Sequence, residues 1–157
     1  MYRLSDKLTV ELAALCEDIR EEKGGKITLI GVFSGDVQVT ELPAKIRVAF
    51  YFSLQSTKLE DLQLKIRFSH DDTTIVEADA PLHLTDDHGV KRHFANLIIP
   101  LGIMSVEKPT WLRVSIQAEG HDWVEVIKKF IFDGAATPPS ASVQPASQSP
   151  DVGREIA

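Results

Sequence analysis

The sequence has few of the residues and segments that define several large classes of proteins. It contains one cysteine, Cys16, so no disulfide can form within the chain and a reducing compartment is expected. No uncharged apolar run approaches the roughly 18 residues that a membrane-spanning helix needs. Glu11 interrupts the apolar N-terminal run, and Leu15 precedes the cysteine where a lipoprotein signal requires a small residue. We therefore predict a cytoplasmic protein with no membrane partner.

Positive charge is also scarce. The 157 residues include 17 Lys and Arg against 23 Asp and Glu, which gives a formal net charge of −6. Binding to a phosphate backbone depends on clustered Lys and Arg, so a nucleic-acid partner is not expected. The hydrophobic content of 43% is enough for a core of ordinary size.

Alternation of apolar and polar residues is the main structural signal. It is regular in three segments and less regular in two more, where Lys128 would point inward unless a bulge intervenes. The regular segments are 45–54, 62–69 and 111–118, and the others are 90–99 and 123–132. Four prolines fall outside the alternating runs and are expected to separate strands: Pro43, Pro81, Pro100 and Pro109. Residues 119–122 are expected to form a hairpin turn.

These segments predict an all-β protein, a single antiparallel β-sandwich of about seven or eight strands. We assign the sandwich domain to residues 1–133. Residues 134–157 hold four of the eight prolines, with Ala, Ser and Gln but no aromatic residue. Such a segment buries too little apolar area to offset its ordering entropy, so a disordered tail is expected.

The N-terminal segment is compatible with two structures. Leu8, Leu12, Leu15 and Ile19 have helical spacing, which favours a helix ending near Gly24. Alternatively, residues 10–20 form a strand that pairs with residues 26–33 through a turn at Gly24-Gly25. A helix buries Leu12 and Leu15 on one face, whereas an undistorted strand sends them to opposite faces.

The same region resembles a family of uncharacterised bacterial proteins. The resemblance rests on Leu15-Cys16-Glu17-Asp18, on residues 25–33 (GKITLIGVF), on Leu42-Pro43, and on a closing hairpin from Phe94 through Trp111 to residues 119–122. Glu17 stands where the family has Asp. The resemblance covers residues 10–132 and implies a small sandwich whose first two segments are strands, which favours the hairpin. It implies no catalytic or ligand residues.

Few residues suggest chemistry. Cys16 lies beside Glu17 and Asp18, which disfavour a thiolate, so it is expected to be a core residue rather than a nucleophile. His83, His88 and His93 are five residues apart, a spacing that matches no common zinc site. We predict no catalytic residue and no cofactor. The weak candidates for calcium or zinc ligands are Asp71, Asp72, Asp86, Asp87 and His88.

We predict a non-enzymatic module that binds a protein partner or forms a homo-oligomer. Trp111 is the candidate contact residue, because it falls on the polar side of its strand. The alternatives are a metal-dependent sandwich and, with less support, a hydrolase that joins one of the histidines to a Ser and an Asp.

The composition of the tail leads to a testable prediction. A chain that ends at Asp133 should keep its melting temperature within about 2 °C, because residues 134–157 carry no apolar periodicity with which to pack on a core. Thermal melts of the full and shortened chains test this. A larger loss would mean that the tail packs on the sandwich.

Overall fold

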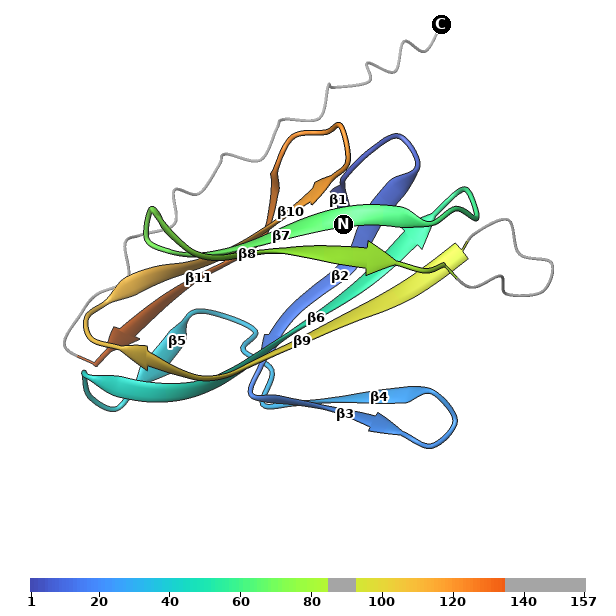
Figure 1. Ribbon diagram of the computed structural model, residues 1–157. Coiled ribbons are helices and arrows are strands. Elements are labelled where there is room, and N and C mark those ends of the chain that lie inside the picture. Colours follow the sequence, from blue (N-terminus) through green and yellow to red (C-terminus); the bar gives the residue numbers. More distant parts are fainter. Residues whose placement is uncertain (85–92, 135–157) are drawn as a thin grey trace, which may run out of the picture.

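The structure, a computed structural model, describes residues 1–84 and 93–134 and is built from strands (Figure 1). The bounds of the strands are β1 Tyr2–Arg3, β2 Leu8–Cys16, β3 Asp18–Glu22, β4 Lys26–Ile30, β5 Val37–Val39, β6 Ala44–Ser56, β7 Leu62–His70, β8 Thr73–Leu82, β9 His93–Val106, β10 Thr110–Ala118 and β11 Val124–Asp133. No helix long and apolar enough to cross a membrane occurs in the described ranges.

The strands form two sheets and a separate hairpin. One sheet has the order β1-β2-β6-β9, the other has the order β5-β11-β10-β7-β8, and β3 pairs with β4. All pairs are antiparallel except β5 with β11. The prediction of an all-β fold is confirmed. The described strands outnumber the expected seven or eight because β1 and β5 are very short and β8 lacks apolar alternation.

The two sheets pack face to face through their inner side chains. The rings of Phe50 on β6 and Phe68 on β7 lie 5.6 Å apart between centroids, which links one sheet to the other. The regular alternation expected in β6, β7 and β10 is what supplies these inner faces. Burial of their apolar area, at about 25 cal/mol per Å², is the main stabilising contribution.

The N-terminal segment is a strand, but its expected pairing was partly wrong. β3 and β4 do form a hairpin, with Gly24 and Gly25 at φ +88° and +75° in its turn. β2, however, pairs with β6, from Leu8 opposite Ser56 to Cys16 opposite Ala49. The reason is burial: a five-residue strand at the edge cannot cover β2, whereas the thirteen-residue β6 can.

The chain changes direction between β2 and β3. The backbone N–H of Glu17 donates to the carbonyl of Ile30 at 3.0 Å, and the N–H of Phe33 donates to the carbonyl of Leu15 at 2.9 Å. These bonds fix the base of the hairpin to the end of β2. In Figure 1 the hairpin projects away from the two sheets.

Bulges decide which way several side chains point. The register of β2 on β6 shifts between Val10 and Leu12, which leaves Leu12 49% exposed and Leu15 1% exposed. A second register shift, where β11 passes Val114 and Ser115, turns the side chain of Lys128 outward. Lys128 is therefore exposed and does not point into the core, as strict alternation would require.

Two prolines do not separate strands as expected. Pro81 lies within β8 and Pro100 lies within β9. Each of these strands is the last in its sheet. Proline is tolerated at such an edge because its missing N–H has no neighbouring strand to which it would donate.

The exposures of the two leucines on β2 lead to a prediction. Leu15→Ala should lower the free energy of unfolding by about 2–5 kcal/mol, because it leaves a cavity in the core. Leu12→Ala should change it by less than about 1 kcal/mol. Urea denaturation of both variants tests the assignment, and equal losses would contradict the strand register described here.

Candidate functional site

An apolar groove opens on one side of the sandwich. It lies between β8 and β9, the two edge strands that run next to each other in Figure 1. Its floor includes Phe50, Phe68 and Val114, all buried core residues from both sheets. The volume of the groove is about 160 Å³, similar to an engineered apolar cavity of about 150 Å³ that accepts benzene.

The walls of the groove come from the two edge strands. Val76 and Ala78 of β8 are exposed on one side, and Leu97 and Ile99 of β9 are half-buried on the other. Asp79 is the charged residue in its lining. The groove can therefore accept an apolar side chain, and the backbones of its rims can offer hydrogen bonds to an added strand.

This groove could not be recognised from the sequence alone. The signal was present in residues 93–106, a fourteen-residue run that contains no Asp, Glu, Lys or Arg. Such a run predicts a strand, but it does not reveal whether one side of the strand lacks a neighbour. That depends on the order of strands in the sheet.

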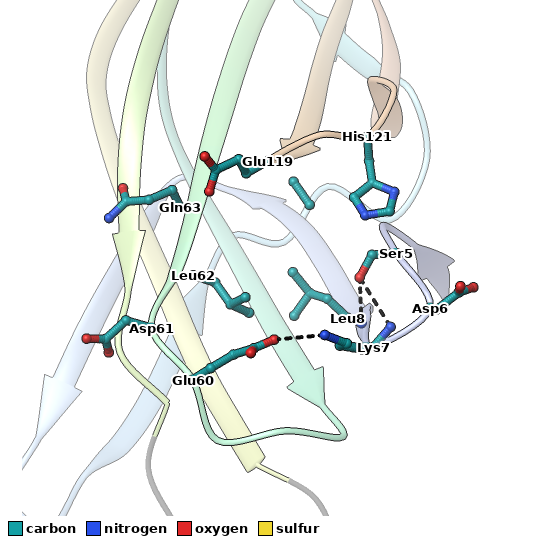
Figure 2. A pocket seen from close by; sticks show the side chains of 11 residues that line it. Ser5, Asp6, Lys7, Leu8, Glu60, Asp61, Leu62, Gln63, Glu119 and His121 are labelled. Atoms are coloured by element: carbon teal, nitrogen blue, oxygen red, sulfur yellow. Dashed lines mark hydrogen bonds and ion pairs between the residues drawn. The ribbon is translucent and has the colours of Figure 1, made fainter.

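A second hollow of about 390 Å³ lies at one end of the sandwich (Figure 2). Loops before β2, before β7 and after β10 line it with four carboxylates, those of Asp6, Glu60, Asp61 and Glu119. Glu60 pairs with Lys7 at 3.6 Å, and Asp6 and Asp61 point away from the centre in Figure 2. The carboxylates do not converge on one point, which gives this hollow an acidic rim rather than a built binding site.

Ser5 and His121 also line this end hollow. The Ser5 hydroxyl accepts the backbone N–H groups of Lys7 at 3.2 Å and Leu8 at 3.1 Å. This bonding is typical of a turn-forming serine. Ser5 therefore holds the turn before β2, and its geometry does not indicate a nucleophile.

Trp111 lies on the outer face of the five-stranded sheet, as its place in the alternation predicts. Its ring packs on Phe130 at 5.0 Å between centroids, and the Lys128 ammonium lies 4.6 Å from the ring centroid. Phe132 stacks on Phe130 at 5.9 Å. The indole is thus half-buried among its neighbours, and a contact of Trp111 with a protein partner stays a prediction.

Asp71 and Asp72 both have structural partners. The Asp71 carboxylate accepts the backbone N–H of Trp111 at 2.9 Å, in a turn where Asp71 has φ +52°. This bond holds the pKa of Asp71 below its usual value. Asp72 pairs with Arg113 at 3.1 Å.

The remaining metal candidates, Asp86, Asp87 and His88, lie outside the described residues. Within the described ranges, no three His, Cys, Asp or Glu side chains are grouped so that they could hold a metal ion. The metal-dependent alternative stays a prediction without support from Asp71 and Asp72.

Cys16 and the histidines have ordinary environments. Burial raises the pKa of the Cys16 thiol, and the charge of Asp18 raises it further, so the neutral thiol is favoured. His83 pairs with Asp61 at 3.0 Å, with both side chains largely exposed. His93 begins β9, and His88 lies outside the described residues. These positions do not indicate a nucleophile with an activating base.

Comparison with known proteins identifies a family without an assigned activity. A model of a family of unknown function, DUF6941, matches residues 11–126. No curated protein matches the sequence. The function therefore has to be inferred from the structure.

The lowered pKa of Asp71 leads to a prediction about acid stability. A depressed pKa in the folded state contributes stability above the unfolded value of about 3.9, and this contribution is lost as the pH falls through the folded value. Asp71→Asn should therefore show a shallower loss of stability below about pH 4 than the unmodified chain. Urea melts between pH 2 and pH 6 measure this, and identical pH profiles would contradict the role of Asp71.

Proposed function

The chain belongs to the DUF6941 family of unknown function. We propose that it is a non-enzymatic, cytoplasmic protein-interaction module. The groove between β8 and β9 receives a segment of another polypeptide chain. The single observation that carries the proposal is the groove itself, an apolar hollow that reaches the core. It is bordered by β8 and β9, on sides where neither strand pairs with another strand of the described ranges 1–84 and 93–134.

The groove leaves apolar side chains in contact with water. Its apolar walls include Val76, which is 44% exposed, and the partly buried Leu97 and Ile99. A partner that covers them removes apolar area from water, which is favourable by about 25 cal/mol per Å² before the costs of association. Backbone hydrogen bonds to an edge strand would fix the direction of the partner.

The groups that could do chemistry support the non-enzymatic part of the proposal. The thiol of Cys16 is buried and favoured in its neutral form, while Asp71 and Asp72 are bound to Trp111 and Arg113. None of these residues lines the groove. The groove offers burial and shape, which suit binding rather than proton or group transfer.

Site-specific photo-crosslinking in cells tests this proposal. A benzophenone amino acid at position 78 would replace Ala78 on the groove wall. The matched control would replace Gln117, which lies on the outer face of the same sheet near the end of β10. We expect a discrete protein adduct from position 78 and little from position 117, because only the first position is covered by the bound segment.

Both variants should melt at the same temperature as the unmodified chain, which excludes unfolding as the cause of any adduct. Mass spectrometry then identifies the trapped chain. Equal labelling at both positions, or no adduct at position 78, would overturn the proposed binding at the groove.

A further inference from the structure

The four outer edges of the two sheets are protected to very different degrees. β1 and β5 are too short to template a long pairing, and they cover only Thr9 and Val10 of β2 and residues 131–133 of β11. The part of β2 that β1 leaves uncovered carries Glu11, and the part of β11 that β5 leaves uncovered carries Glu125, Lys128 and Lys129. β8 carries Glu77, Asp79 and Pro81, which are common protective devices on an exposed edge. β9 has fourteen residues and contains no Asp, Glu, Lys or Arg.

The second side of β9 has no neighbouring strand in the part of the chain that the structure describes. A bulge where Val48 and Ala49 face β9 and the proline at Pro100 interrupt the strand in its middle. The stretch from Phe94 to Ile99 lies before this interruption. Natural edge strands of this length usually carry charges that prevent pairing with another chain, and this stretch carries none.

We propose that β9 pairs with β9 of a second copy of this chain, antiparallel and about a two-fold axis at Asn96. This inference rests on the proposed function and names the partner of the same site. The result is one continuous sheet that runs through both copies, with the interface formed by the same residues from each.

The axis at Asn96 follows from which side chains would then face each other. On the outer face Asn96 meets Asn96 of the second copy, and Phe94 meets Ile98, an aromatic and β-branched pair of the kind that stabilises sheets. On the inner face the small Ala95 meets the larger Leu97. An axis one residue further along would place the polar Asn96 against the apolar Ile98.

Charge favours β9 over β8 as the self-pairing edge. The chain has a net charge of −6, which opposes self-association, so the contact between two copies that costs least is one free of acidic residues. Antiparallel pairing of β8 with itself would bring Glu77 and Asp79 toward the same residues of the second copy. Pairing through β9 brings no charged side chain of the strand to the axis.

The same arrangement covers the groove. A two-fold axis perpendicular to the sheet keeps the inner faces of both copies on the same side, so the grooves beside the two β9 strands face each other across the axis. Leu97, which is half-buried in one copy, then lies opposite Ala95 of the other, and Ile99 lies opposite His93.

The C-terminal segment of the same chain is a poorer occupant. Residues 135–157 contain Pro138, Pro139, Pro145 and Pro150, each of which lacks the N–H that an added strand donates. Between these prolines the longest run is the five residues 140–144, and the seven residues 151–157 after Pro150 include Asp151, Arg154 and Glu155. A second β9 offers an uninterrupted stretch without such charges from Phe94 to Ile99.

Disulfide trapping tests the axis. In Asn96→Cys the two Cα atoms would face each other at about 4.5–5.5 Å, within the range that a disulfide spans. The matched control is Ile98→Cys, which places the thiol on the same strand and the same face. In this variant the Cα atoms of residue 98 in the two copies would be about 14 Å apart, too far for a disulfide. The native Cys16 is fully buried and does not compete.

We expect mild oxidation to convert most of the Asn96→Cys chains, and few of the Ile98→Cys chains, to a dimer that reducing agent dissolves. Equal yields from the two variants would overturn the axis at Asn96. Absence of a dimer from Asn96→Cys would overturn the pairing through β9.

Light scattering after size-exclusion chromatography tests the dimer without a cross-link. The full chain should elute with twice its mass of 17.4 kDa at high concentration. Asn96→Lys places two ammonium groups opposite each other and should weaken the dimer at least about tenfold. Ser105→Lys is the control, because Ser105 is also exposed on β9 but lies beyond Pro100.

The two proposals fail in different ways. An adduct of position 78 with a different protein, together with a strict monomer, would overturn the second-copy inference and leave the proposed function standing. A monomer with no adduct at position 78 would overturn both.

Discussion

Strand β6 carries the packing on which the rest of the structure depends. Its inner face places Phe50, Phe52 and Leu54 in the core, where Phe50 meets Phe68 of the facing sheet. Its two sides pair with β2 and β9. Thirteen residues with one apolar face can bury both neighbours at once, and no other described strand joins two long neighbours in the four-stranded sheet β1-β2-β6-β9.

This central position leaves β9 at the outside. In the facing sheet β10 plays the same part, with β11 on one side and β7 on the other, and β8 is left outside. The outermost strands β8 and β9 lie on the same side of the sandwich, and in the part of the chain that the structure describes a groove there reaches the core without a further strand to close it. Such an opening exposes apolar surface to water, which is unfavourable unless a partner covers it.

The outer face of the five-stranded sheet differs from the groove in chemical character. Arg67 lies 3.9 Å from the ring centroid of Trp123 and also pairs with Glu77 at 3.0 Å. Arg113 pairs with Asp72, and Lys128 covers Trp111. These side chains form ion pairs and cation–π contacts with one another, so the aromatic rings on this face are partly covered by residues of the same chain. Among the described residues the groove has no such internal cover, which is why it carries the proposed function.

Local sequence determined the identity of the regular strands and of the turns. The alternation in 45–54, 62–69 and 111–118 depends only on one face being buried, and Gly24-Gly25 depends only on local φ angles, so both could be predicted. The family resemblance correctly favoured a strand over a helix at β2, and the match to residues 11–126 confirms a family of unknown function.

Tertiary structure decided the remaining features, because each depends on residues far apart in the chain. β2 pairs with β6 rather than with the segment that follows it, since only β6 buries it. The bulge facing Val114 and Ser115 turns Lys128 outward, and its position is set by the register between β10 and β11. The groove arises in the same way: residues 93–106 predict an apolar strand, but the order of the strands is what leaves one side of that strand open.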